Sequence, residues 1–343
     1  MKKISLVIPC YNVSEYLDRC WKSIQNQSIG LDSLECIFVN DMSDDGGKTW
    51  DKLLKIEKDS PDSVILIDME VKGGPGGCRN VGLKYASGKY LEFLDSDDEL
   101  VDYACELLYE TAEKYHADVI QFNHFHMIEG DRRIVKSCTA NEMIKISNTN
   151  ERAIVLCTGK VTYGVWNKFY RMELVRGVNS QFPPLVRYEE PLFVFPLFLY
   201  ARNIFLLDEE LYLYYRRPNS IISSEVDKHI LDHPYVQLML LENIMNRGEI
   251  FNQNFDAIEL YFLWSFYCET LLFAARTEKS KLPLDFFLQM QEVCRAFFRN
   301  WRDNKYIVKE NNKAWSVLET IDKNIKTQEE VNELVTYAFE ELT

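Results

Sequence analysis

Acidic side chains gather directly after a β-prone run in residues 88–100, which read GKYLEFLDSDDEL. They are Asp95, Asp97, Asp98 and Glu99, with no lysine or arginine between them. Alternate residues of an extended segment share a face, so Asp95 and Asp97 can converge on one hard cation while Ser96 points away. Without a cation, repulsion would cost roughly 1 kcal/mol or more per close pair. The stretch is therefore either a metal site able to bridge a diphosphate or a solvated turn.

Three further loops contain residues that a hydrophobic core would not select. They are residues 9–12 (PCYN), residues 40–46 (NDMSDDG) and the glycine cluster 73–77 (GGPGG), which Arg79 and Asn80 follow. These residue types suit a nucleotide: the Tyr11 ring can lie against a base, the Asp41 carboxylate can accept a base N–H, and Arg79 can approach the ring or the phosphates. Each loop alone is also typical of an ordinary turn, and the glycine cluster matches neither the dinucleotide-binding nor the Walker pattern.

Short strands and helices must position these loops. β-rich runs occupy residues 4–8, 35–39, 63–67 and 90–94, and helical patterns occupy residues 14–24, with Ser14 as the expected cap, 49–58 and 79–86. Strands that alternate with helices predict an α/β fold with a mostly parallel sheet. Ligand sites in such sheets lie beyond the carboxyl ends of the strands, which is where the loops begin.

The pattern changes along the rest of the chain. We expect a helix near residues 103–115, a strand at 118–122, a polar stretch at 137–151, and then helices with wide apolar stripes at 226–247, 256–276, 284–302 and 313–325. This change places a domain boundary near residue 220. Aromatic residues occur on most sides of the expected helix 256–276, which predicts burial in a helical bundle rather than docking on a membrane or partner.

Composition narrows the classes of function. The 39 basic and 53 acidic residues give a net charge of -14, the wrong sign for a nucleic-acid partner, so we expect none. The nine cysteines are nowhere spaced as CxxC, which argues against a zinc ribbon or a disulfide framework and favours a reducing cytosol. His124 and His126 alternate on one expected strand face, but no acid follows at ligand spacing, so zinc is not predicted.

The chain also shows little sign of export or membrane insertion. Its N-terminal apolar run is too short for a signal peptide, and the later run at residues 192–200 is too short to span a bilayer. We therefore expect a cytoplasmic protein, with peripheral contact at the inner face of the membrane left open.

Blocks of residues resemble, in order and spacing, the family 2 glycosyltransferases with the GT-A fold. The blocks are residues 7–12 (VIPCYN), the loop around Asp41, 77–82 (GCRNVG), 93–98 (FLDSDD), 165–170 (VWNKFY), 188–191 (YEEP) with Phe193, and 214–217 (YYRR) with 220–222 (SII). The resemblance implies a GT-A catalytic domain at residues 1–220, with a nucleotide-binding half at 1–100 and an acceptor half at 101–220. Residues 221–343 would form a helical C-terminal region.

The resemblance implies an inverting, metal-dependent transfer of a sugar from a UDP-sugar to a hydroxyl of a saccharide, teichoic-acid or lipid-linked acceptor of the cell envelope. It assigns Asp97, with Asp95, to Mn2+ or Mg2+, and Asp98 to a supporting position. The residues that it assigns to the nucleotide are Pro9, Tyr11 and Asp41 for uracil, Arg79, and Asp95 for the ribose side. Lys168, Arg216 and Arg217 would add positive charge near the phosphates.

The acid pair of the family corresponds here to Glu189 and Glu190. The resemblance makes Glu190 the general base and Glu189 a sugar or acceptor contact. The family has aspartate at the second position. Because the Glu190 side chain is longer by one methylene, its backbone or the acceptor must lie correspondingly farther away for the carboxylate to act as the base. Two acids before Pro191 are also typical of an ordinary helix start, in which case Asp208 and Glu209 are the next candidates for the base.

The chain departs from the family pattern at three further positions, Asn40, Met42 and Cys78. Two other functions stay open at this stage. A sugar-nucleotide nucleotidyltransferase shares the parallel sheet and the metal, but typically has a basic, glycine-rich loop after its first strand. In a non-catalytic nucleotide-sugar binding protein, Glu190 would have no catalytic role.

Overall fold

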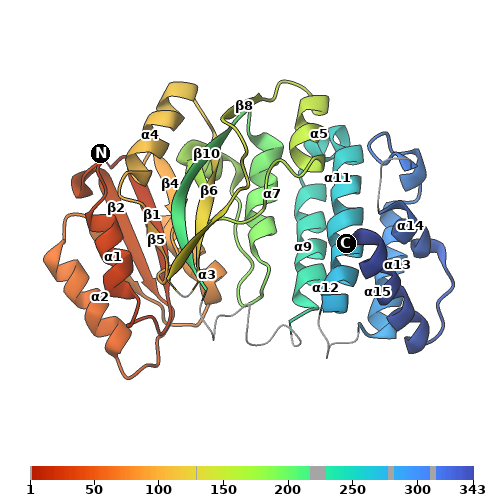
Figure 1. The fold of residues 1–343 in the computed structure, drawn as a ribbon, viewed down its shortest axis with the longest axis horizontal. Coiled ribbons are helices and arrows are strands. Elements are labelled where there is room, and N and C mark those ends of the chain that lie inside the picture. The colour runs from red at the N-terminus through yellow and green to blue at the C-terminus, as the bar shows by residue number, and fades with distance from the viewer. Residues whose placement is uncertain (1, 129, 217–228, 277–281, 310–313) are drawn as a thin grey trace. The chain divides into compact units, whose positions relative to one another are not determined.

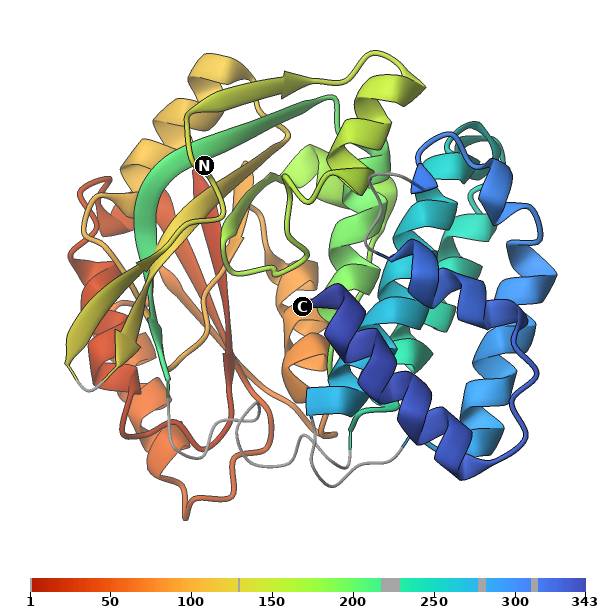
Figure 2. The same ribbon diagram turned by 45° about the vertical axis from the view of Figure 1, so that its right-hand side comes forward.

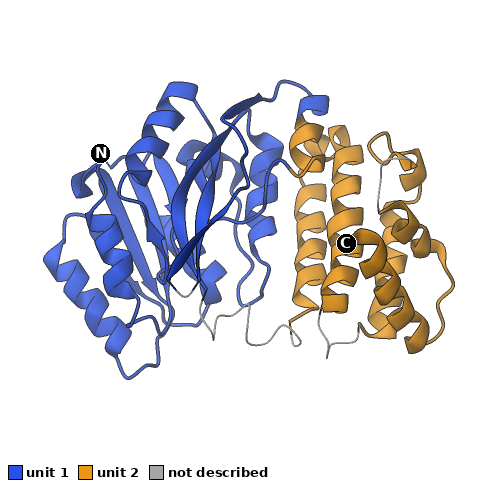
Figure 3. Cartoon of the chain, viewed as in Figure 1, with its two compact units in different colours: residues 1–151, 160–217 blue, residues 152–159, 218–343 orange. Residues whose placement is uncertain are grey.

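The computed structural model describes residues 2–128, 130–216, 229–276, 282–309 and 314–343 (Figure 1). The chain divides into two compact units (Figure 3). Residues 1–151 and 160–217 form unit 1, and residues 152–159 and 218–343 form unit 2. The boundary predicted near residue 220 falls outside the described residues.

Unit 1 is built on a ten-stranded sheet with a path order of β3-β2-β1-β4-β9-β6-β10-β5. The strands on this path are β1 (Ile4–Cys10), β2 (Leu34–Asn40), β3 (Val64–Asp68), β4 (Tyr90–Phe93), β5 (Glu99–Leu100), β6 (Val119–Ile128), β9 (Lys168–Arg171) and β10 (Asn203–Tyr215). β7 (Asp131–Val135) pairs with β6, and β8 (Glu142–Lys145) pairs with β10. The first four strands pair in parallel as predicted, whereas β9 lies antiparallel between β4 and β6.

Helices flank the sheet of unit 1, which confirms the predicted α/β class. They are α1 (Leu17–Gln25), α2 (Lys48–Asp59), α3 (Gly74–Tyr85), α4 (Ala104–Tyr115), α6 (Met172–Val178) and α7 (Glu190–Tyr200), with α5 (Thr149–Cys157) shared between the units. Leu6 and Ile8 belong to the buried cluster that includes α1, α2 and α4. Val7 lies between them in sequence and faces Gly82 of α3, because alternate residues of a strand point to opposite faces.

Two predictions about where helices start are wrong. The first helix begins at Leu17 with Tyr16 as its N-cap, so Ser14 does not cap it. The glycine cluster is not a connection before a helix that starts at residue 79, because α3 begins at Gly74. Glycine is required there by close packing: a Cβ at Gly76 would lie 2.8 Å from the Pro183 carbonyl oxygen.

The described residues of unit 2 form helices. They are α9 (Asp232–Met245), α10 (Glu249–Gln253), α11 (Phe255–Phe262), a π-helical stretch (Leu263–Glu269), α12 (Thr270–Arg276), α13 (Leu284–Phe297), α14 (Trp315–Leu318) and α15 (Gln328–Leu342), with short 3-10 helices at Trp301–Asp303 and Glu319–Asp322. The last helix, α15, was not predicted and packs on α12 and α13 (Figure 2). Its start does carry a sequence signal, since Thr327 and Glu330 form a reciprocal capping box.

The stretch Phe255–Arg276 is long and apolar enough to cross a membrane by length and composition. However, 78% of its most apolar window is buried within the protein, as the distribution of its aromatic residues predicts. The cysteines behave as small core residues: all nine are free thiols and eight are buried, with Cys157 half-buried.

Candidate functional site

The carboxyl ends of three parallel strands meet at one edge of the sheet in unit 1. Cys10 of β1 lies opposite Asn40 of β2, and Val7 lies opposite Phe93 of β4. The residues that follow these strands include Tyr11, Asp41 and Asp95. Because parallel strands bring these loops together, this edge is the place where the sequence-predicted residues can converge.

Arg79 of α3 joins two of the predicted acids. Its Nη1 donates to Glu189 Oε1 at 2.7 Å, and its Nη2 donates to Asp95 Oδ1 at 2.9 Å. The side chain is only 4% exposed, and its guanidinium carbon lies 5.5 Å from the centroid of the Phe182 ring. Burial alone would lower the pKa of Arg79, but the charges of Asp95 and Glu189 outweigh it and raise the pKa. Arg79 is therefore a fixed cation between two carboxylates.

Asp41 fixes the start of α3. Its Oδ1 accepts a hydrogen bond from Gly73 N at 2.7 Å, and its Oδ2 accepts one from Gly74 N at 2.9 Å. These bonds to the glycine cluster were not predicted from the sequence. A buried carboxylate at the N-terminus of a helix is stabilised by the helix dipole as well as by these two amides.

Tyr11 presents a partly open ring beside Asp41. The residue is 40% exposed, and its hydroxyl donates to Asp44 Oδ1 at 3.0 Å. The Lys72 ammonium lies 3.8 Å from the ring centroid, a cation–π contact for which the sequence held no clear local signal. Pro9 is half-buried near the end of β1.

The acidic stretch forms a turn rather than the extended segment that we expected, because Asp98 N donates to Asp95 O at 3.0 Å. The expected alternation of side chains nevertheless holds: Asp95 and Asp97 are partly exposed, whereas Ser96 and Asp98 are buried. Among the described residues, no group of three or more His, Cys, Asp or Glu side chains is arranged to hold a metal.

Asp98 ties this turn to β10. Its Oδ2 accepts from the Tyr212 hydroxyl at 2.8 Å, and its Oδ1 accepts from Tyr215 N at 2.8 Å. The Tyr212 hydroxyl also accepts from Asp95 N at 3.1 Å. Burial, then the charge of Asp97, then that of Asp95 raise the pKa of Asp98 well above its usual range.

Glu189 and Glu190 point to different partners at the start of α7. Glu189 occupies the N-cap position, but its side chain makes no capping bond and reaches Arg79 instead. Glu190 Oε1 accepts from Val165 N at 3.2 Å. Burial and then the charge of Glu189 raise the pKa of Glu190 to about 7. A simple helix start does not account for these contacts.

Lys168, which was predicted near the phosphates, directs its ammonium to oxygens of its own loop. It is fully buried, and its Nζ donates to Thr162 Oγ1 at 3.0 Å, Gly164 O at 2.6 Å and Asn167 Oδ1 at 2.8 Å. Burial lowers the pKa of Lys168 to about 7, although the charge of Glu190 opposes this shift. Lys168 therefore closes the loop that carries Val165.

The remaining candidates make other contacts. Arg216 is exposed at the end of β10, where its backbone N donates to Met127 O at 3.4 Å. Arg217 and the block at residues 220–222 fall outside the described residues. Asp208 Oδ1 accepts from Asn123 Nδ2 at 2.9 Å and from Lys136 Nζ at 2.8 Å, so this alternative base is already paired.

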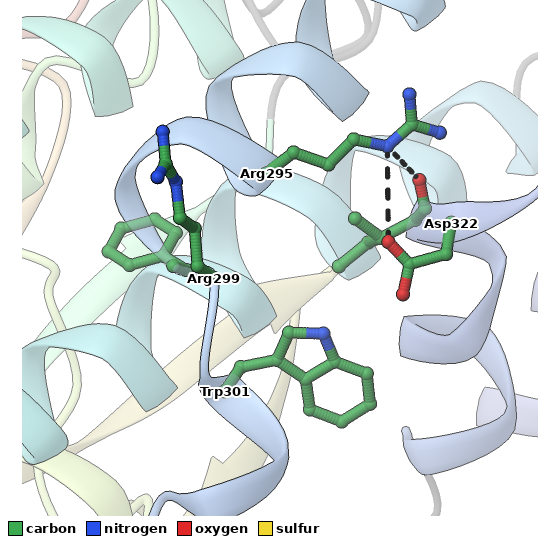
Figure 4. Close-up of a pocket in the computed structure, with 6 residues that line it drawn as sticks. Arg295, Arg299, Trp301 and Asp322 are labelled. Atoms are coloured by element: carbon green, nitrogen blue, oxygen red, sulfur yellow. Dashed lines mark hydrogen bonds and ion pairs between the residues drawn. The ribbon is translucent and has the colours of Figure 1, made fainter.

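A separate pocket in unit 2 contains none of the predicted residues (Figure 4). Its lining includes Arg295, Arg299, Trp301 and Asp322. Arg295 Nε donates to Ile321 O at 2.9 Å and lies 3.9 Å from Asp322 Oδ1. The Arg295 side chain is thus already paired with residues of unit 2.

Comparison with known proteins gives consistent matches. Residues 5–178 match the model of the family described as Glycosyl transferase family 2. The chain is 30% identical over 223 residues to the glycosyltransferase EpsJ of Bacillus subtilis strain 168, covering 64% of this chain and 62% of that protein. It is 30% identical over 205 residues to a poly(ribitol-phosphate) beta-glucosyltransferase of Bacillus spizizenii, covering 59% and 30% respectively. The matched stretch thus spans less than two thirds of either relative.

A solved structure shows the same fold. The crystal structure of S. aureus TarS 1-349 in complex with UDP-GlcNAc matches with a TM-score of 0.73 at 19% identity, covering 99% of this chain and 91% of that one. The family match contains Asp41, Arg79 and Asp97, whereas Glu189 and Glu190 lie beyond it. Since the match extends over half of the chain and the fold agrees, this chain belongs to glycosyltransferase family 2 and has the GT-A fold with a helical C-terminal region.

Proposed function

We propose that this chain moves a sugar from a UDP-sugar to a hydroxyl of a cell-envelope saccharide or polymer, with inversion at the anomeric carbon and with the help of Mn2+ or Mg2+. The observation that carries the proposal is the Arg79 bridge from Asp95 to Glu189. It places the acidic turn, where a diphosphate would be held, beside the residue that precedes Glu190. The UDP-GlcNAc complex of TarS supports a UDP-sugar donor, and the Bacillus spizizenii relative supports a polymer acceptor.

The nucleotide would lie over the carboxyl ends of β1 and β2. The partly exposed ring of Tyr11 offers a stacking surface for uracil, with Pro9 near it at the end of β1. Asp41 keeps lone pairs beyond its two amide bonds and can accept a base N–H. Arg79 supplies a buried positive charge near the ribose and diphosphate, on the Asp95 side.

The acidic turn fits a hard divalent cation. Asp95 and Asp97 offer partly exposed carboxylate oxygens as ligands, and burial together with the charges of Asp97 and Asp95 raises the pKa of the neighbouring Asp98. Mg2+ and similar ions need only one or two protein carboxylates when substrate phosphates and water complete the shell, so a three-residue cluster is not required. Asp97, with Asp95, would hold the ion. Such an ion neutralises charge on the departing diphosphate.

Glu190 would accept the proton of the attacking hydroxyl. As the acceptor oxygen bonds to the anomeric carbon, the bond to the diphosphate oxygen breaks and UDP leaves with the electron pair. A pKa of about 7 suits a general base at neutral pH. Val165 N holds one carboxylate oxygen, and the other would accept the proton. Attack from the face opposite the diphosphate inverts the configuration and requires no covalent intermediate.

Isothermal titration calorimetry of the full chain with UDP-Glc, UDP-Gal, UDP-GlcNAc and UDP-GalNAc, with and without Mn2+, tests the donor class. We expect tight binding of one UDP-sugar only with the metal, and slow release of UDP. Pyrophosphate release from UTP and a sugar phosphate would favour a nucleotidyltransferase. Binding with no UDP release and no transfer would favour a binding protein. The proposed setting is the cytoplasmic side of the membrane, where peripheral contact brings the enzyme to a lipid-linked or polymeric acceptor.

A further inference from the structure

An aromatic cluster lies beside the loop that holds Glu190. We define it as His124, His126, Trp166 and Tyr214. The Trp166 and Tyr214 rings stack with centroids 5.5 Å apart and an interplanar angle of 19°. His124 meets Trp166 edge-on at 4.7 Å, and His126 lies 5.2 Å from Tyr214. All four side chains are partly exposed, so the cluster is not a closed part of the core.

Two contacts of Trp166 connect this aromatic cluster to the proposed base and to the acidic turn. Trp166 directly follows Val165, whose N–H holds Glu190. The Trp166 ring is also 4.8 Å from the ring of Tyr212, whose hydroxyl binds Asp98. The cluster therefore adjoins both the residue proposed as the base and the acidic turn. An acceptor at that position would bring its hydroxyl near both the proposed base and the proposed donor site.

The histidines carry unused hydrogen-bonding capacity. His124 Nδ1 and His126 Nε2 are buried without a partner among the described residues, which costs free energy unless a ligand or water satisfies them. Burial, and then the charge of His126, lowers the pKa of His124 to about 4, so this ring is neutral at physiological pH. A neutral imidazole has one donor and one acceptor nitrogen, which match the hydroxyl groups of a sugar.

We propose that the aromatic cluster is the acceptor subsite, and that it receives a terminal pyranose whose C–H face packs on Trp166 and Tyr214 while its hydroxyls bond to the histidines. This inference rests on the proposed function. It narrows the acceptor to a saccharide end, because a linear polyol phosphate has no ring face to present to stacked aromatic side chains.

The test compares Trp166→Leu and the milder His126→Gln with a control, Trp264→Leu, which changes a 38% exposed tryptophan in unit 2. We expect Trp166→Leu to raise the acceptor KM about tenfold or more, as for loss of a buried aromatic anchor. UDP affinity by calorimetry and donor hydrolysis without acceptor should stay within about twofold of wild type, a shift too small to indicate a lost contact. His126→Gln should raise the acceptor KM less, at an unchanged melting temperature. An unchanged acceptor KM in both variants, or an equal loss of UDP affinity, overturns the subsite.

A second measurement separates this inference from the proposed function. Tryptophan fluorescence of the full chain is titrated with methyl glycosides of glucose, galactose, N-acetylglucosamine and N-acetylgalactosamine, and with ribitol phosphate. We expect one glycoside to bind, ribitol phosphate not to bind, and His126→Gln to weaken the glycoside. If UDP-sugars fail to bind but a glycoside does, the donor proposal falls and the saccharide site stands. Binding of ribitol phosphate alone, or of no glycoside while UDP binds, refutes the saccharide site.

Discussion

Arg79 Nη1 lies 2.7 Å from Glu189 Oε1, although the two residues are 110 positions apart in the chain. Both side chains are nearly buried, at 4% and 10% exposure, so the pair is shielded from solvent. A buried pair of this kind is costly to break, because the remaining charge is left uncompensated. The contact therefore holds the start of α7, and with it Glu190, against α3.

Arg79→Lys tests whether the bridge needs a guanidinium. Lysine keeps the charge, but its compact ammonium lacks the rigid planar geometry with which the two terminal nitrogens of arginine bind Asp95 and Glu189. We expect a lower melting temperature and UDP affinity reduced by about tenfold. Arg176→Lys is the matched control, because Arg176 donates only to the backbone oxygen of Ala86, at 2.7 Å. Equal melting temperatures and UDP affinities of the two variants would mean that the guanidinium of Arg79 has no special role.

Glu190→Gln removes the proposed base but keeps its size and its ability to accept from Val165 N. Transfer should fall by about 100-fold or more, on the scale of general-base loss, while UDP binding and melting temperature stay unchanged. Steady-state kinetics beside thermal melting check this. Asp208→Asn serves as the comparison; if that variant loses the activity and Glu190→Gln does not, the base has been misassigned.

The pH profile of transfer gives an independent check on Glu190. A general base acts in its deprotonated form, and the pKa of Glu190 is raised to about 7. The value of kcat/KM should therefore rise with pH through about 7 and then level off. The residual activity of Glu190→Gln should lack this step. A wild-type profile that is flat from pH 6 to 8 would be inconsistent with a base of this pKa.

Asp97→Asn addresses the proposed metal. Loss of a charged ligand should weaken Mn2+-dependent UDP binding by about 2 kcal/mol or more. Asp62→Asn changes an exposed aspartate elsewhere and should leave binding unchanged. Calorimetry in Mn2+ and in EDTA provides the measurement. Equal UDP affinity of the wild type in both buffers would remove the metal from the proposal.

Glu92 of β4 should make stability depend on pH. It is fully buried, both carboxylate oxygens lack a partner among the described residues, and burial raises its pKa to about 8. The folded chain keeps this proton up to about pH 8, whereas the unfolded chain releases it near its ordinary value of 4.5, so the free energy of unfolding falls as pH rises between these values.

Glu92→Gln removes that dependence. The variant should resemble the wild type near pH 5 and exceed it near pH 8 by a few kcal/mol, on the order expected for a shift of this size. Denaturant midpoints at the two pH values measure the difference. The exposed Glu110→Gln is the control; a gain of the same size in that variant, or none in Glu92→Gln, would contradict the assignment.

Several features of this protein were determined by local sequence. The strand and helix order of the first hundred residues and the burial of the aromatic helix both follow from patterns over a few turns or strand positions. The glycine cluster could be recognised in the sequence, but its position in α3 could not, because glycine is a weak helix former. Close packing of Gly76 against Pro183 explains why glycine is needed in this helix.

The site itself was decided by the tertiary structure. No local pattern indicates that Arg79 will pair with Glu189, that Asp41 will hold the start of α3, or that β9 will enter the sheet antiparallel. Lys168 is the clearest case, because a lysine beside aromatic residues suggests an exposed cation, yet it is fully buried and bound to three oxygens of its own loop. Charge and residue type are properties of the sequence, whereas the partner of a charge depends on which distant segments the chain path brings together.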